Sequence, residues 1–132
     1  MQQTIAGIAL LVADYDEAIA FYTQKLGFAL ISDIDLGGGR RWVQVAPNSA
    51  SETRLVLSKT DTPEQRSHVG KQTDGRVLLF LHTDNFWRDY QAMSARGVHF
   101  LETPREEAYG TVAVFEDLYG NTWDLLQPSP AP

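Results

Sequence analysis

The sequence contains no cysteine. This absence excludes a disulfide framework, thiolate zinc sites and thiol nucleophiles. The chain also lacks any stretch near the roughly 18 consecutive apolar residues that span a bilayer. Its N-terminal residues show no basic segment followed by an apolar run, which a secretory signal would require. We therefore expect no membrane partner and a cytoplasmic location.

Basic residues are scarce. Eleven Lys and Arg stand against 17 Asp and Glu, which gives a formal net charge of −6. Nucleic acids and anionic membranes are bound through a basic face, so neither is an expected partner. A cationic ligand is compatible with this charge. With 132 residues and 43% hydrophobic content, the composition is that of an ordinary single domain whose core needs no metal or disulfide.

The second half of the chain repeats the organisation of the first half. In each half an apolar run is followed by an acidic residue, a stretch of helical spacing, a glycine and another apolar run. Asp14 and Gly27 in the first half correspond to Asp84 and Gly97 in the second. The sequence thus predicts module one at residues 5–58, a linker at 59–76 and module two at 77–127, all within one domain spanning residues 1–132.

Local signals define the expected elements. Asp14 and Glu17 form a capping box at the start of a helix, and Gly27 ends that helix. The run Leu36-Gly37-Gly38-Gly39 predicts a hairpin between two strands. The predicted strands lie at residues 5–13, 28–35, 41–46, 54–58, 77–83, 98–101, 111–115 and 122–126, the second helix at 86–96, and a loop at 104–110.

Three segments resemble the vicinal-oxygen-chelate superfamily, the glyoxalase/bleomycin-resistance/dioxygenase group. They are AIAFYTQKLGF at residues 18–28, ARGV at 95–98 and DLYGNTWD at 117–124, within a likeness that covers residues 5–127. The resemblance implies an α+β fold in which two tandem βαβββ modules form a curled mixed sheet around a cavity. It also implies a homodimer and a small-molecule ligand. Many relatives are metalloenzymes, and others bind antibiotics without a metal.

The resemblance also places four metal-ligand positions in this sequence. They fall on Gly7, on Leu78 (Val77 if counted from Asp84), on Asp124 and, near the end of module one, on Val56. Of these only Asp124 can bind a metal, whereas a metal site needs about three or four protein ligands. No cofactor is therefore expected, although a divalent metal is not excluded.

Strand alternation predicts which side chains line the cavity, because alternate residues of a strand point to opposite faces. A register that sends Leu78 inward also sends Phe80 and His82 inward. Tyr109, in the loop at 104–110, is a candidate lid residue. The predicted ligand-binding residues are Trp42, Gln44, Arg54, Phe80, His82, Tyr109, Phe115 and Asp124. Apolar walls with a few polar groups are typical of a small-molecule pocket.

The residues leave several functions open. The leading hypothesis is metal-free binding of an apolar or aromatic small molecule, for sequestration or resistance. The alternative is a metal-dependent lyase, isomerase or dioxygenase, similar to lactoylglutathione lyase, with a site rebuilt around His82 and Asp124. A non-enzymatic interaction module is a third. Each residue also has a plainer interpretation: Trp42 as core, His82 as a solvated histidine, and Asp124 as the ion-pair partner of Arg54.

Overall fold

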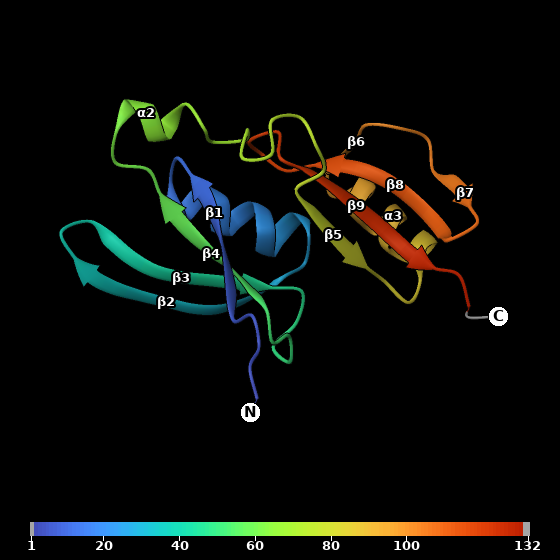
Figure 1. The fold of residues 1–132 in the computed structure, drawn as a ribbon, viewed down its shortest axis with the longest axis horizontal. Helices are drawn as coiled ribbons and strands as arrows, with labels where there is room; N and C mark the ends of the chain where they lie inside the picture. The colour runs from blue at the N-terminus through green and yellow to red at the C-terminus, as the bar shows by residue number, and fades with distance from the viewer. Residues whose placement is uncertain (1, 131–132) are drawn as a thin grey trace. The chain divides into compact units, whose positions relative to one another are not determined.

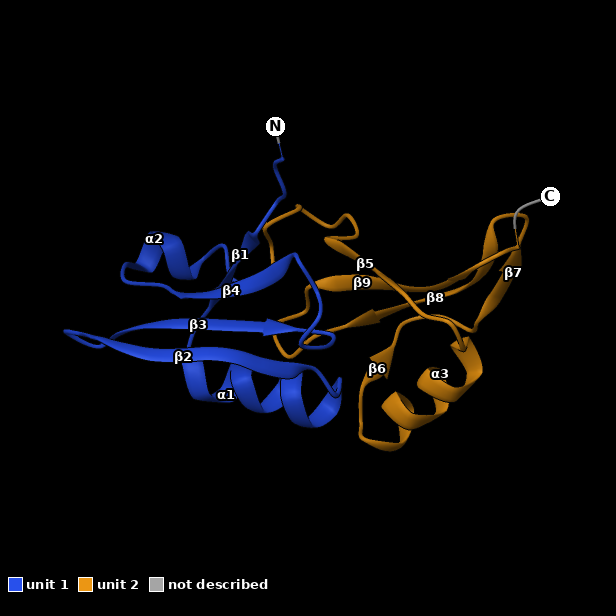
Figure 2. Ribbon diagram, turned by 90° about the horizontal axis from the view of Figure 1, so that it is seen from below, with its two compact units in different colours: residues 1–70 blue, residues 71–132 orange. Residues whose placement is uncertain are grey.

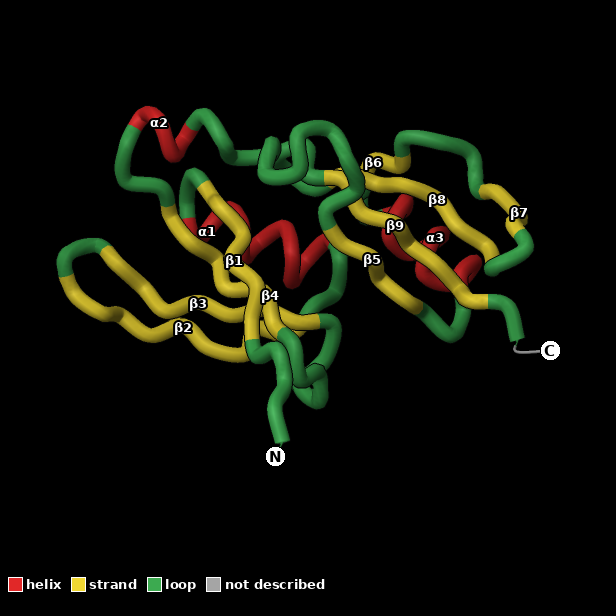
Figure 3. Tube along the Cα trace, viewed as in Figure 1, coloured by secondary structure: helices red, strands yellow, loops and turns green. Residues whose placement is uncertain are grey.

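The computed structural model describes residues 2–130. The chain divides into two compact units, residues 1–70 and residues 71–132 (Figure 2). The division falls after Gly70, within the predicted linker. Strands and loops make up most of each unit, as Figure 3 shows, and each unit carries a helix against its sheet.

The first unit contains a mixed sheet with the strand order β1-β4-β3-β2 (Figure 1). Strand β1 runs parallel to β4, and the other neighbours are antiparallel. The predicted linker contains a short helix, α2, that the sequence did not indicate. The elements are β1 (Gly7–Val12), α1 (Tyr15–Ala20), the π-helical turn η1 (Phe21–Lys25), β2 (Ala29–Gly37), β3 (Arg40–Ala46), β4 (Arg54–Lys59) and α2 (Pro63–Arg66).

The second unit repeats this arrangement with the order β5-β9-β8-β6, in which β5 runs parallel to β9. A short strand, β7, also pairs with β8, where a loop was predicted. The elements are β5 (Leu79–His82), α3 (Phe86–Ala95), β6 (His99–Phe100), β7 (Arg105–Glu107), β8 (Gly110–Glu116) and β9 (Thr122–Pro128). The prediction of an α+β fold built from two modules with mixed sheets is confirmed.

The first helix starts where the capping signal predicts. The Asp14 carboxylate accepts a hydrogen bond from the Glu17 backbone N–H at 2.9 Å. Gly27 ends the helical segment with a φ of 79°, a conformation that glycine adopts without steric cost. Between them the helix widens to π-helical hydrogen bonding over Phe21–Lys25, a change of pitch without a sequence signal.

Each unit has its core between its helix and one face of its sheet. In the first unit Tyr22 of the helical segment is fully buried over alternate residues of the strands. Each fully buried Val or Leu side chain of these strands stabilises the fold by about 1.5–3 kcal/mol, so the strand register is firmly set. The core residues on the strands include Leu10, Val12, Val43, Val45, Leu55 and Leu57 in the first unit, and Ala113, Phe115, Trp123 and Leu125 in the second.

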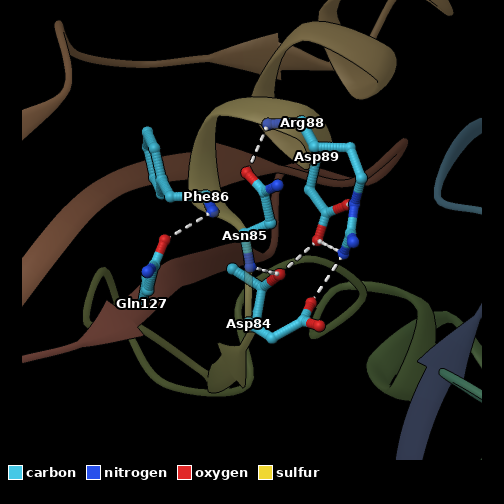
Figure 4. A network of polar contacts seen from close by, with 7 residues as sticks. Asp84, Asn85, Phe86, Arg88, Asp89 and Gln127 are labelled. Carbon is cyan, nitrogen blue, oxygen red and sulfur yellow. Dashed lines mark hydrogen bonds and ion pairs between the residues drawn. The ribbon is translucent and has the colours of Figure 1, made fainter. Parts of the chain in front are cut away.

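Polar contacts fix α3 to the sheet of the second unit (Figure 4). The Asn85 side chain accepts a hydrogen bond from the Arg88 N–H at 3.1 Å, and Gln127 of β9 accepts one from the Phe86 N–H at 2.8 Å. Burial raises the pKa of Asp89, but the hydrogen bonds from Arg88 and Thr83 and the nearby charges of Arg88 and Arg96 together outweigh it, so the pKa lies below its usual range. The helix is thus held on one face of the sheet.

Candidate functional site

The face of the first sheet opposite α1 presents a row of side chains across the strands. Ala9 pairs with Val56, Val56 with Gln44, and Gln44 with Ser32, so these residues share one face. The Ser32 hydroxyl donates to Gln44 Oε1 at 3.2 Å. This bond orients the amide of Gln44 through its oxygen.

Trp42 lies on the same face, directly opposite Ile34 of β2. Their exposed fractions are 41% and 54%, so an indole ring and an aliphatic side chain face solvent side by side. The exposed indole of Trp42 thus presents both a polar N–H group and a large apolar ring surface to solvent. The plainer interpretation of Trp42 as a core residue does not hold.

A hollow of ≈ 190 Å³ opens beside Trp42. It forms because β3 and β4 pair only through Val43–Val45 and 55–57 and then diverge. Ligand pockets for drug-sized molecules measure about 300–1,000 Å³, so the hollow is smaller than such a pocket. The lining residues are Tyr15, Leu36, Arg40, Arg41, Trp42, Val56, Leu57, Ser58 and Lys59.

Arg54 lies at the end of β4, opposite Gly7. Its Nε donates a long hydrogen bond of 3.4 Å to the Ser51 carbonyl. Within residues 2–130, Arg54 takes part in no ion pair, and neither does Asp124.

Of the positions at which the resemblance implies metal ligands, only Asp124 carries a side chain that could bind a metal. A Cβ atom placed on Gly7 would lie 2.9 Å from the Val56 Cγ2 atom, closer than real Cβ contacts allow. The valine thus fills the space that a ligating side chain at Gly7 would need. Over residues 2–130, no three His, Asp or Glu side chains come together in a way that could hold a metal ion.

The second sheet has a comparable open face, opposite α3. Phe80 of β5 and Val114 of β8 flank Asp124 of β9 on its two sides. His82 follows, beside Leu126. The Phe80 side chain has an exposed fraction of 65%, and His82 is exposed as well. In this register Phe80, His82 and Asp124 share one face, as the sequence predicted.

The electrostatic setting of Asp124 is unusual for a surface carboxylate. Burial raises the pKa of Asp124; attraction by Arg105 lowers it, and repulsion by Glu102 raises it again. The net pKa lies above the usual range. Arg105 does not neutralise Asp124 by direct contact, because its Nε binds both Glu102 oxygens at 3.1 and 3.2 Å and its Nη1 binds Glu107 at 3.0 Å.

Phe115 is not on the open face, which corrects the sequence prediction. It pairs with Trp123 and stacks on that ring at a centroid distance of 5.8 Å, and it is fully buried. Because Trp123 and Asp124 are neighbours on β9 and point to opposite faces, Phe115 lies on the helix side. Tyr109, between β7 and β8, is 53% exposed, and its carbonyl accepts a hydrogen bond from the Ser129 N–H.

The structure therefore groups the predicted residues by unit. Trp42, Gln44 and Arg54 lie on the first open face, and Phe80, His82 and Asp124 on the second. Sequence reasoning missed Ser32 and Ile34 of β2. A bulge between Leu30 and Ser32 shifts the pairing there, so alternation along β2 does not show which residues join Trp42.

Comparison with known proteins gives the family. Residues 4–125 match the model of the Glyoxalase/Bleomycin resistance protein/Dioxygenase superfamily. The chain belongs to this superfamily. A relative within it, an uncharacterized protein of Shewanella frigidimarina (strain NCIMB 400), is 54% identical over 128 residues, which covers 96% of this chain and 95% of the relative.

Two solved structures of similar length support the superfamily fold. UcmS2 has a TM-score of 0.82 and 33% identity, and covers 96% of this chain and 98% of its own. TnmS3, described as an antibiotic binding protein from Streptomyces sp. CB03234, has a TM-score of 0.80 and 32% identity, with 97% and 98% covered. The chain is thus a glyoxalase/bleomycin-resistance-like protein.

Proposed function

We propose that the protein binds an apolar or aromatic small molecule without a metal ion, and that binding serves sequestration or resistance. The observation that carries this proposal is the packing of Val56 over Gly7, at 2.9 Å from the Cβ that any other residue would place there. At the positions where metalloenzyme relatives have metal-ligating side chains, this chain keeps a surface that can bind a small molecule. It combines an exposed indole with hydrogen-bond donors.

Two further observations support a binding role. Trp42 and Ile34 supply adjacent apolar surface, and the hollow beside Trp42 admits part of a planar molecule. The similar protein TnmS3 is described as antibiotic binding. For this chain, an apolar or aromatic compound is the ligand class that such a surface favours.

The proposal predicts how the protein responds to metal ions. After dialysis against EDTA, added Ni²⁺, Mn²⁺ or Zn²⁺ should change the melting temperature by less than about 1 °C, because a ligand stabilises the fold only when the native state binds it. A bound metal at a hundredfold excess over its Kd would contribute about 2.7 kcal/mol, a shift of several degrees. Differential scanning calorimetry measures this. A shift of that size that disappears in Asp124→Ala would instead support the metalloenzyme alternative.

The homodimer implied by the resemblance stays a proposal. It is supported by large apolar side chains that face solvent on the β2–β3 hairpin, among them Ile34 at 54% and Leu36 at 61% exposure. A cytoplasmic location also stays a prediction. Among the helices in the described part of the chain, none is both long and apolar enough to cross a membrane.

A further inference from the structure

The Asp124 carboxylate is a charged group without a hydrogen-bonding partner among the described residues, and its direct neighbours across the strands, Phe80 and Val114, are apolar. It lies on β9, between Phe80 and Val114, with Leu126 two positions further along the same face. No side chain or backbone N–H of residues 2–130 donates a hydrogen bond to its oxygens. A carboxylate in such surroundings keeps its capacity to accept, and partial burial makes an incoming cation more favourable than it would be in water.

Arg105, the arginine near Asp124, does not bind the Asp124 carboxylate. Arg105 is committed to Glu102 and Glu107 through contacts of 3.0–3.2 Å, so two carboxylates already balance its single charge. Asp124 adds a further negative charge to this group. The net charge around Asp124 is therefore negative, and the formal net charge of the whole chain is −6. Both favour an approaching cation over an anion.

The exposed ring of Phe80 gives an organic cation a second attractive group beside the Asp124 carboxylate. Phe80 is cross-strand neighbour of Asp124 and is 65% exposed, so its ring lies within reach of a group that binds the carboxylate. An aromatic face attracts a cation by about 0.5–1 kcal/mol at exposed sites and also packs against apolar surface. A metal ion gains little from a ring and one carboxylate, whereas an organic ammonium uses both.

We propose that the open face of the second sheet binds the cationic end of the ligand, a protonated amine attached to an aromatic or apolar body. The ammonium group donates its hydrogen bonds to Asp124. The apolar body packs on Phe80 and Leu126. This inference rests on the proposed small-molecule function and names the ligand class, an organic amine, that the open face of the second sheet binds.

Three probes with one ring system test the inference: naphthylmethylamine, naphthalenemethanol and naphthoate. They carry a positive, a neutral and a negative group at neutral pH. Titration of ¹⁵N-labelled protein, followed by NMR, gives the Kd and the residues that respond. We expect the amine to bind about fivefold or more tightly than the carboxylate, with shifts at the amides of Phe80, Asp124 and Leu126.

Two variants separate local charge from net charge. Asp124→Asn keeps the side-chain shape and should remove the preference for the amine while leaving the Kd of the alcohol unchanged. Glu106→Gln on β7 changes the net charge equally but removes a carboxylate that binds Thr111, and should keep the preference. Phe80→Ala should weaken binding of the amine. Each variant is first checked for a native ¹⁵N spectrum.

The outcomes distinguish this inference from the proposed function. If the alcohol binds near Trp42 but the amine shows no preference, or keeps its preference in Asp124→Asn, the inference is wrong and the proposed function stands. If none of the three probes binds at any surface, both are wrong. A preference that Asp124→Asn alone removes supports both.

Discussion

Replacing Trp42 by alanine is expected to weaken the binding of naphthalenemethanol by about thirtyfold, or roughly 2 kcal/mol, the loss typical when a central aromatic contact is truncated. The reason is geometric. Trp42 presents an exposed indole next to Ile34 and above the hollow between β3 and β4. No other aromatic side chain lies on the open face of the first sheet among the described residues. The Kd from an NMR titration measures the effect.

Trp87 provides the matched control. It is 48% exposed, close to the 41% of Trp42, but it lies on α3 and packs against Phe86 and Tyr90. Trp87→Ala should leave the Kd unchanged. If both substitutions weaken binding equally, the ring contributes through general stability or nonspecific stacking, and Trp42 is not a binding residue.

Gly110→Ala is expected to have the largest effect on stability, a loss of about 3–5 kcal/mol. A Cβ atom at this position would lie 2.1 Å from the Gln127 carbonyl oxygen and 3.0 Å from the Pro128 Cα, and both are backbone atoms. The φ of 149° adds strain for any other residue. Overpacking and an unfavourable backbone conformation each cost about 1–3 kcal/mol, and moving β9 away from β8 would be the only relief.

Gly38→Ala is the control for this substitution. Gly38 also has a positive φ, 64°, but a Cβ there would meet nothing within 4 Å. It should cost only about 1 kcal/mol, the penalty of the left-handed backbone. Urea unfolding compares the two variants. Equal losses would mean that β8 and β9 do not approach as closely at Gly110 as the structure has them, and the placement of Asp124 beside Val114 would then be in doubt.

Much of the fold follows from local sequence signals. Asp14, Glu17 and Gly27 mark a helix because capping and left-handed termination depend on a few adjacent residues. The two modules follow from a repeated order of such signals. Alternation predicted that Leu10 and Val12 are buried under the helix and that Trp42 points to the opposite face of the sheet. The reason is that the side chains of a strand alternate between its two faces whatever its partners are.

The parts that were wrong depend on pairing between distant segments. Phe115 was placed in the cavity, but its face is decided by the partner Trp123 on β9, which the sequence of β8 does not contain. Strand β7, at Arg105–Glu107, forms only because β8 offers it an edge. The packing of Val56 against Gly7 was not predicted, because it arises from the parallel pairing of β1 with β4.

We expect a metal-free surface around Trp42 to bind an aromatic small molecule. A ¹⁵N NMR titration with naphthalenemethanol in buffer containing EDTA tests it most directly. We expect saturable shifts of the Trp42 indole N–H and the Gln44 side-chain amide, and a Kd that stays the same when Zn²⁺ replaces EDTA. An absence of saturable shifts at these groups, or binding that appears only with the metal, would contradict it.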